Sequence, residues 1–194
     1  CALRSSAGRP FDAEAALQRA RKVAPQAPRP LLLTGQRLLR DGQPAQALAA
    51  WDTLRERHPG AFLLVADDYA AAARASGEAD AARAALESAL TQLPAVEVLR
   101  ALERLDGDGQ RVTRLLAHLQ QHPTLSAAQL LLDVPAEQWP PEAWTALRLA
   151  VMRAAKPLQR YRCAACGFEA QNYFWQCPGC LSWDSYPTQR IDAL

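Results

Sequence analysis

Four cysteines near the C-terminal end are the residues of this sequence best suited to chemistry. They form two pairs, Cys163-Ala-Ala-Cys166 and Cys177-Pro-Gly-Cys180, with ten residues between the pairs. A CxxC turn holds two sulfurs on one tight bend, and a second pair at this distance can complete a tetrahedron of thiolates around one metal ion. Four thiolates leave no coordination position open for water or substrate. We therefore expect a structural metal site, not a catalytic one.

The segment that carries these cysteines is short. Residues from about Tyr161 to Leu194 are too few to bury a self-sufficient core. Zinc binding contributes an apparent ~10–16 kcal/mol in small metal-binding peptides, enough to offset the ordering of such a segment. Two disulfides are the alternative, but a reducing cytosol would not maintain them and CxxC geometry disfavours local pairs.

Aromatic residues are concentrated around the cysteine pairs. Seven of the thirteen in the chain fall here: Tyr161, Phe168, Tyr173, Phe174, Trp175, Trp183 and Tyr186. We expect them to form a small core and a face that docks on the rest of the protein. A more specific alternative is that these aromatic residues are exposed and bind a protein partner, because aromatic residues are enriched among interface hot spots. Stacking on single-stranded nucleic acid is a third alternative, which the weak basic charge of the tail disfavours.

The residues before the tail repeat with a period of about 34. The repeating positions are Gly8, Gly42 and Gly77; Ala13, Ala47 and Ala82; Leu17, Trp51 and Leu86; Ala20, Leu54 and Ala89; and Pro25, Pro59 and Pro94. A small residue, a large apolar residue and a closing proline at this period resemble the tetratricopeptide repeat. Alanines permit close approach of two antiparallel helices, and the proline ends the second helix.

The predicted fold class is mostly α, a helical solenoid followed by a small rubredoxin-like or zinc-ribbon domain. We place the repeats and a C-terminal capping helix in residues 1–156, and the metal domain in residues 157–194. The expected elements are two full repeats (Pro28–Gly60 and Ala61–Ala95), a degenerate hairpin (Val96–Leu105 and Gln110–Gln121), a short helix (Leu125–Asp133) and a last helix (Glu142–Ala155) that leads through Pro157 into the tail.

The repeat register predicts that the first repeat is truncated. Gly35 and Ala70 occupy the first-helix position that packs on its neighbour, and Cys1 is the equivalent residue one repeat earlier. We expect Cys1 to be a small packing residue and not a fifth ligand. We also expect further repeats upstream.

Several functional classes are disfavoured. The formal charge is +2 with acids and bases interspersed, so nucleic acid is not an expected partner. No apolar stretch approaches the ~18 residues of a membrane span, and we expect this segment to be soluble. His118 and His122 lack the glutamate of an HExxH site and are predicted surface residues. Asp106 to Gly109 form a turn and not a calcium loop. We expect no enzymatic activity.

The 34-residue helical repeats are followed by two motifs, Tyr161-Arg162-Cys163-x-x-Cys166-Gly167-Phe168 and Trp175-x-Cys177-Pro178-x-Cys180. This combination resembles the lipopolysaccharide assembly protein B family of Gram-negative bacteria. This resemblance implies a membrane anchor upstream of this chain and a location on the cytoplasmic face of the inner membrane. It implies an adaptor through which the membrane protease FtsH degrades the deacetylase LpxC, which limits lipopolysaccharide synthesis. It also implies Cys163, Cys166, Cys177 and Cys180 as the metal ligands.

The metal is expected to be one Zn²⁺, with iron as the alternative, because an all-thiolate tetrahedron accepts both. Iron rubredoxins usually follow both cysteine pairs with glycine and separate them by a longer loop. Here Gly167 follows the first pair but Leu181 follows the second. A leucine at positive φ costs about 1–2 kcal/mol, so the second turn is predicted to differ from the first.

Two functions therefore compete. The first is an adaptor whose first helices line a groove for a protein partner, with candidate binding residues Arg29, Gln36, Arg40, Asp67 and Arg74. The second is a redox-active, rubredoxin-like iron protein in electron transfer. The first is favoured, because no flavin or nicotinamide motif supplies an electron partner.

Overall fold

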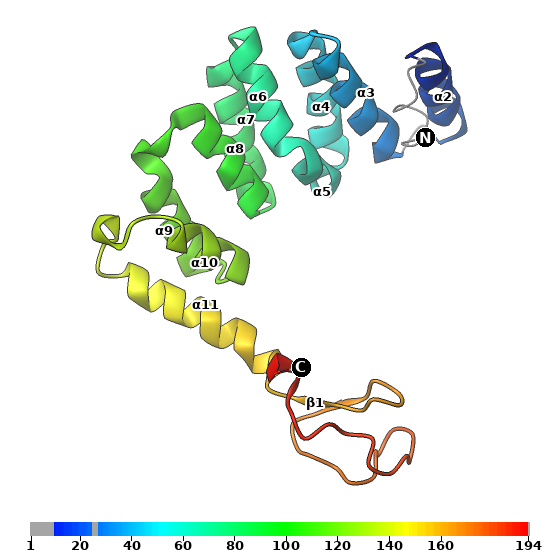
Figure 1. Ribbon diagram of the computed structural model, residues 1–194. Helices are drawn as coiled ribbons and strands as arrows, with labels where there is room; N and C mark the ends of the chain where they lie inside the picture. The colour runs from blue at the N-terminus through cyan, green and yellow to red at the C-terminus, as the bar shows by residue number, and fades with distance from the viewer. Residues whose placement is uncertain (1–9, 25–26, 194) are drawn as a thin grey trace. The chain divides into compact units, whose positions relative to one another are not determined.

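The computed structural model describes residues 10–24 and 27–193 (Figure 1). Three positions of the repeat pattern, Cys1, Gly8 and Pro25, lie outside the described residues. The chain divides into two compact units, one that ends at Arg111 and one that begins at Val112.

The first unit is a stack of helices, as the repeat pattern predicts (Figure 1). Its elements are α2 (Pro10–Val23), α3 (Pro28–Arg40), α4 (Pro44–Arg57), α5 (Pro59–Phe62), η1 (Leu63–Val65), α6 (Ala66–Ser76), α7 (Ala79–Gln92), α8 (Val96–Asp106) and η2 (Asp108–Gln110). The helix α3 packs on α4, α4 on α6, and α6 on both α7 and α8. The helical prediction is therefore confirmed as an array of neighbouring helices.

Glycine and proline set the ends of these helices. Gly42 follows α3 with φ of 73°, and Gly77 follows α6 with φ of 78°. The left-handed conformation is accessible to glycine without a Cβ clash, so each helix can end there and reverse direction. Proline occupies the first turn of α4 and α5, where its missing N–H leaves no helical bond unmade.

The core of the first unit lies at the repeating positions. Ala47, Trp51 and Leu54 of α4 are buried, and so are Ala82 and Leu86 of α7. The indole N–H of Trp51 donates to the carbonyl of Leu32 at 3.3 Å, which satisfies the buried polar group. The period read from the sequence therefore marks the side chains that hold adjacent helices together.

The first helix of the second repeat is interrupted. It begins as α5, continues as the 3-10 turn η1 and resumes as α6. The backbone at Val65 has φ of −129° and ψ of 8°, outside the helical region, and this residue marks the break. Leu64 lies in the 3-10 turn of this interrupted helix and is exposed at the surface.

The degenerate hairpin predicted after Pro94 crosses the boundary between the two units. Its first helix is α8, and the predicted turn is present, with φ of 70° at Gly107 followed by η2. Arg83 of α7 forms an ion pair with Asp106, so this carboxylate helps to hold α8 on its neighbour. The second predicted helix is α9 (Arg111–Gln121). Both helices are confirmed, and their pairing stays a prediction.

The second unit contains three helices and the cysteine-rich tail. Its elements are α9, α10 (Leu125–Leu132), η3 (Ala136–Gln138), α11 (Ala143–Leu158), β1 (Tyr161–Arg162), β2 (Glu169–Ala170) and η4 (Ile191–Ala193). Thr124 caps α10, because its hydroxyl oxygen accepts the N–H of Ala127 at 3.3 Å. The predicted domain boundary between residues 156 and 157 is not tested by this division and stays a prediction.

Two details of the second unit differ from the sequence expectations. The helix α11 continues through Pro157 to Leu158 instead of ending at Ala155. Proline in the last turn removes one backbone hydrogen bond, and only one more helical residue follows it. His118 was expected at the surface but is 7% exposed, on the buried side of α9 with Leu115 and Leu119. His122, one turn later, is exposed.

The helices formed by residues 10–24 and 27–193 include none with the length and apolarity that a bilayer crossing requires.

Candidate metal centre

The two cysteine pairs have the same backbone hydrogen bonds. In the first, the N–H of Gly167 donates to Cys163 O at 2.9 Å, and in the second the N–H of Leu181 donates to Cys177 O at 2.8 Å. The Cys163 N–H also donates to Phe168 O, and the Cys177 N–H to Ser182 O. The two CxxC turns, or knuckles, therefore have the same structure, and each presents two sulfurs.

The residue after each pair has a left-handed backbone, and this corrects one prediction. Gly167 has φ of 78° and Leu181 has φ of 62°. The second turn was expected to avoid this conformation because leucine carries a Cβ. The matching hydrogen bonds hold Leu181 in it instead, and the side chain escapes further crowding because it is exposed. The leucine therefore no longer argues against an iron-type knuckle.

The sulfur atoms of Cys163, Cys166, Cys177 and Cys180 come together within 4.8 Å of one another. Across the two knuckles, Cys163 Sγ lies 3.8 Å from Cys180 Sγ, and Cys166 Sγ lies 3.7 Å from Cys177 Sγ. A tetrahedral ion with metal–sulfur bonds of about 2.3 Å requires its sulfurs to be about 3.8 Å apart. The separations fit such an ion. They are far longer than a disulfide bond of about 2.05 Å, and all four cysteines are free.

Small polar groups surround the sulfurs. Ser185 Oγ lies 3.2 Å from Cys163 Sγ, and Ser182 Oγ lies 3.4 Å from Cys180 Sγ. The N–H of Gly179 donates to Cys177 Sγ at 3.4 Å. Hydrogen bonds to sulfur stabilise the thiolate, the form that binds metal. Groups of the same short segment therefore stabilise negative charge on the sulfur ligands.

The pKa values show why a cation suits this cluster. Ser185 lowers the pKa of Cys163 to about 6, and Ser182 lowers the pKa of Cys180. The backbone at Phe168 lowers the pKa of Cys166, but hydrogen bonding with Cys180, burial and the other two thiols together raise it to about 12. Four thiols this close together cannot all lose their protons unless a cation neutralises the resulting thiolates. A divalent metal supplies that charge.

The seven aromatic residues of the tail divide into two groups. Tyr186 is buried beside Cys163 and Cys177, and its hydroxyl donates to Phe168 O at 3.2 Å. Burial, and then hydrogen bonding to Cys177, raise the pKa of Tyr186 to about 12. Tyr161 and Tyr173 pack edge-to-face near it, with ring centroids 5.7 Å apart. Trp175 and Trp183 are each 67% exposed, and Phe168 and Phe174 are also at the surface. The predicted small core is confirmed for the tyrosines.

Short-range contacts hold the tail at the end of α11. The N–H of Ile191 in the last turn donates to Arg160 O at 2.8 Å. Glu169 of β2 forms ion pairs with Arg162 at 2.8 Å and Arg160 at 3.8 Å. Residues near both ends of the tail therefore contact Arg160, in the link that joins the tail to α11. Docking of the tail on the repeats of the first unit stays a prediction.

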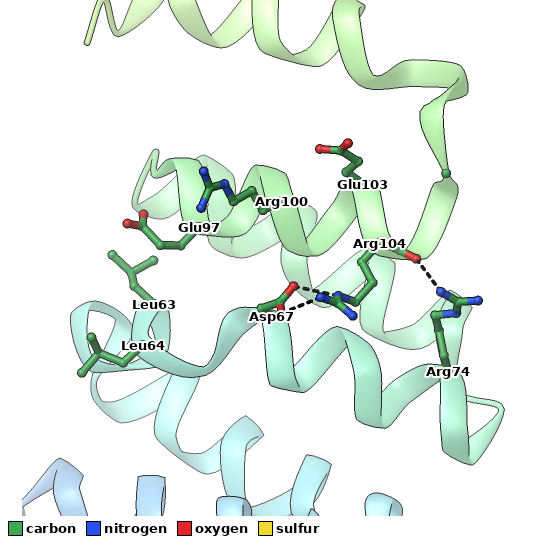
Figure 2. A pocket seen from close by; sticks show the side chains of 9 residues that line it. Leu63, Leu64, Asp67, Arg74, Glu97, Arg100, Glu103 and Arg104 are labelled. Atoms are coloured by element: carbon green, nitrogen blue, oxygen red, sulfur yellow. Dashed lines mark hydrogen bonds and ion pairs between the residues drawn. The ribbon is translucent and has the colours of Figure 1, made fainter. Parts of the chain in front are cut away.

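The five candidate partner-binding residues lie on two helices, α3 and α6. Asp67 and Arg74 of α6 line a groove of about 700 Å³ in the first unit (Figure 2). Arg29, Gln36 and Arg40 lie on α3 and are not among its lining residues. The sequence reasoning missed Leu63 and Leu64, which line the groove from the 3-10 turn η1, and the residues contributed by α8. The repeat pattern loosens after Pro94, so it gave no register for α8.

The metal-binding region matches a known family. Residues 161–186 match the model of a rubredoxin metal-binding domain. Lipopolysaccharide assembly protein B of Escherichia coli strain K12 is 32% identical over 98 residues, and the proteins of the same name from strains CFT073 and O157:H7 match equally. The chain is a homologue of lipopolysaccharide assembly protein B. The match includes 48% of this chain and 25% of the length of each relative.

This homology agrees with the resemblance recognised from the cysteine pairs and repeats. The stretch that matches the lipopolysaccharide assembly protein B relatives is 98 residues long, so it includes residues outside the 161–186 metal-binding region. Together with the stacked helices and the four-cysteine cluster, it shows a homologue with a rubredoxin-type metal domain at its C-terminal end.

Proposed function

We propose that this protein is a non-enzymatic adaptor that limits lipopolysaccharide synthesis by promoting degradation of LpxC by FtsH. The observation that carries the proposal is the presence of a helical stack and a four-cysteine cluster in one chain, which is 32% identical to lipopolysaccharide assembly protein B over 98 residues. A stack of helices offers broad surfaces for proteins. A closed thiolate shell offers no site for a reaction.

The metal in this proposal is one Zn²⁺ held by Cys163, Cys166, Cys177 and Cys180. Its role is to fold the tail, since the described core there is small: the two buried cysteines and Tyr186, with partly buried residues around them. Bound zinc would replace the missing apolar burial and neutralise the clustered thiolates. Iron is the alternative occupant of the same sulfurs.

The proposed location is the cytoplasmic face of the inner membrane, through an anchor in the upstream part of the protein. The proposed partners are FtsH, LpxC or other proteins of the lipopolysaccharide pathway. The helical face that carries Arg29, Gln36, Arg40, Asp67 and Arg74 is the proposed partner surface. The double change Arg29→Glu with Arg40→Glu is expected to weaken partner binding and to leave helicity and metal content unchanged.

The experiment is an LpxC turnover assay in the native organism. Deletion of the gene should lengthen the half-life of LpxC, and the epitope-tagged protein expressed from its native gene should co-purify with FtsH or LpxC. Replacement of Cys163 and Cys177 by Ser should reproduce the deletion. An LpxC half-life that is independent of the gene would refute the proposed function.

A further inference from the structure

A groove between the interrupted first helix of the second repeat and α8 has side chains that are not used for packing (Figure 2). Its volume is about 700 Å³, and every lining residue belongs to the first unit. One side carries Leu63, Leu64, Asp67 and Arg74, and the other carries Glu97, Arg100, Glu103, Arg104 and Gly107. The groove combines an apolar end with charged walls.

The apolar end is formed by Leu63 and Leu64. Leu64 is 75% exposed although it is a large aliphatic residue inside a helical segment. Leu63 is half-buried and packs against the main core of the unit, so the pair is anchored from beneath. An apolar side chain from another molecule would be removed from water by contact with these two leucines, at about 25 cal/mol for each Å² buried.

The middle of the groove is a fixed ion pair. Arg104 of α8 binds Asp67 of α6 with two hydrogen bonds, Nε to Oδ1 and Nη2 to Oδ2, both at 2.7 Å (Figure 2). Arg74 Nη1 donates to the carbonyl of Arg104 at 3.4 Å. This bidentate pair neutralises Asp67 and joins the two walls. The charge of Asp67 is therefore already balanced within the groove.

The remaining charges are unequal at the two ends. Glu103 is neutralised by Arg111 at 3.0 Å. At the apolar end, Glu97 and Arg100 lie on the same helix, and no ion pair joins either of them to another described residue. At the far end, Arg74 has a carbonyl partner and no carboxylate within the described residues. The apolar end is thus neutral overall, because Arg100 offsets Glu97, and a carboxylate is attracted to the unbalanced charge of Arg74 at the far end.

We infer that this groove binds an extended acidic and apolar segment of a protein partner. An apolar side chain of the segment packs on Leu63 and Leu64, and a carboxylate further along it pairs with Arg74. Arg74 is ten positions after Leu64, which corresponds to about 15 Å along a helix and to four or five residues of extended chain. This inference rests on the proposed adaptor function and specifies the segment that the adaptor reads.

The test is selection of random dodecapeptides on the purified protein, followed by binding measurements on the most enriched peptide. Enriched sequences should carry an apolar residue and an acidic residue about four or five positions apart. Arg74→Glu and Leu64→Ser should each weaken binding about tenfold, the effect of losing ~1.4 kcal/mol. Arg148→Glu, the same charge change on an exposed residue of α11, is the matched control and should leave binding unchanged.

A charge swap makes the test specific for Arg74. A peptide in which lysine replaces the acidic residue should bind Arg74→Glu better than it binds the unchanged protein. The inference is overturned if no peptide is enriched, if enriched peptides lack the acidic residue, or if Arg148→Glu weakens binding while Arg74→Glu does not. LpxC turnover separates this inference from the adaptor function. If turnover depends on the gene but is unchanged by both groove variants, the groove assignment fails and the adaptor function stands.

Discussion

Gly35 of α3 packs directly against the indole ring of Trp51 on α4. A Cβ at position 35 would lie 2.7 Å from Trp51 Cδ1 and closer still to Nε1 and Cε2. Trp51 is completely buried and its N–H is already bonded to the backbone of α3, so the ring has no free space to move into. This contact explains why the small-residue position of the repeat is a glycine here.

Gly35→Ala is therefore expected to destabilise the first unit by about 1–3 kcal/mol, the usual effect of overpacking a core. The measurement is urea unfolding followed by circular dichroism. Gly60→Ala is the matched control, since a Cβ there meets nothing within 4 Å. That control should be neutral or stabilising by up to about 1 kcal/mol. Equal stability of the two variants would show that the Gly35 contact is not tight.

Cys177→Ser is expected to unfold the tail and leave the helices intact. The variant retains three thiolates, and without the full shell the small core around Tyr186 cannot order the segment. Metal content, limited proteolysis of the tail and circular dichroism together decide this. Cys1→Ser is the control and should retain metal, because the four clustered cysteines already supply a complete tetrahedral shell. Full protease resistance of a metal-free tail would contradict the prediction.

Leu181→Gly is expected to stabilise the tail by up to about 1 kcal/mol. The change removes the strain of a leucine at positive φ, although the greater freedom of glycine in the unfolded chain offsets part of the gain. Gly167→Ala at the equivalent position of the first knuckle should have the opposite effect. The measurement is the chelator concentration at which tryptophan fluorescence of the tail changes. If both substitutions shift that concentration in the same direction, the two turns are not equivalent.

His118 should make the second unit less stable in mild acid. Burial, and then repulsion from His122, lower its pKa in the folded state below the value of about 6.5 in the unfolded chain. As the pH falls below 6.5, the unfolded state binds more protons than the folded state does. The free energy of unfolding present above this pH is therefore reduced. Thermal unfolding at pH 5.5 and 7.5 should show a smaller difference for His118→Leu than for the unchanged protein. His122→Gln should keep most of the difference.

The sequence predicted best what depends on local spacing. Two CxxC pairs ten residues apart were enough to bring four sulfurs together, because each turn fixes its own two sulfurs. The repeat period marked Trp51 and Leu86 as core residues, because period and burial are linked in any stack of paired helices.

The sequence failed where tertiary contacts override local preference. Leucine disfavours a left-handed backbone, yet the hydrogen bonds of the second knuckle impose it on Leu181. Histidine is a polar residue and was expected at the surface, yet His118 lies on the buried side of α9 with Leu115 and Leu119. The groove lies beside the break at Val65 and is crossed by the long-range pair between Asp67 and Arg104, and neither feature has a local signal.

The four-sulfur zinc site is tested most directly by the metal content of the purified protein together with X-ray absorption at the metal edge. We predict a colourless protein with one zinc per chain and four sulfur ligands at about 2.3 Å. A red protein with one iron and the same four sulfurs would contradict the zinc assignment and revive the electron-transfer function. Absence of bound metal, a nitrogen or oxygen ligand in the shell, or two disulfides among the four cysteines would contradict the structural metal site itself.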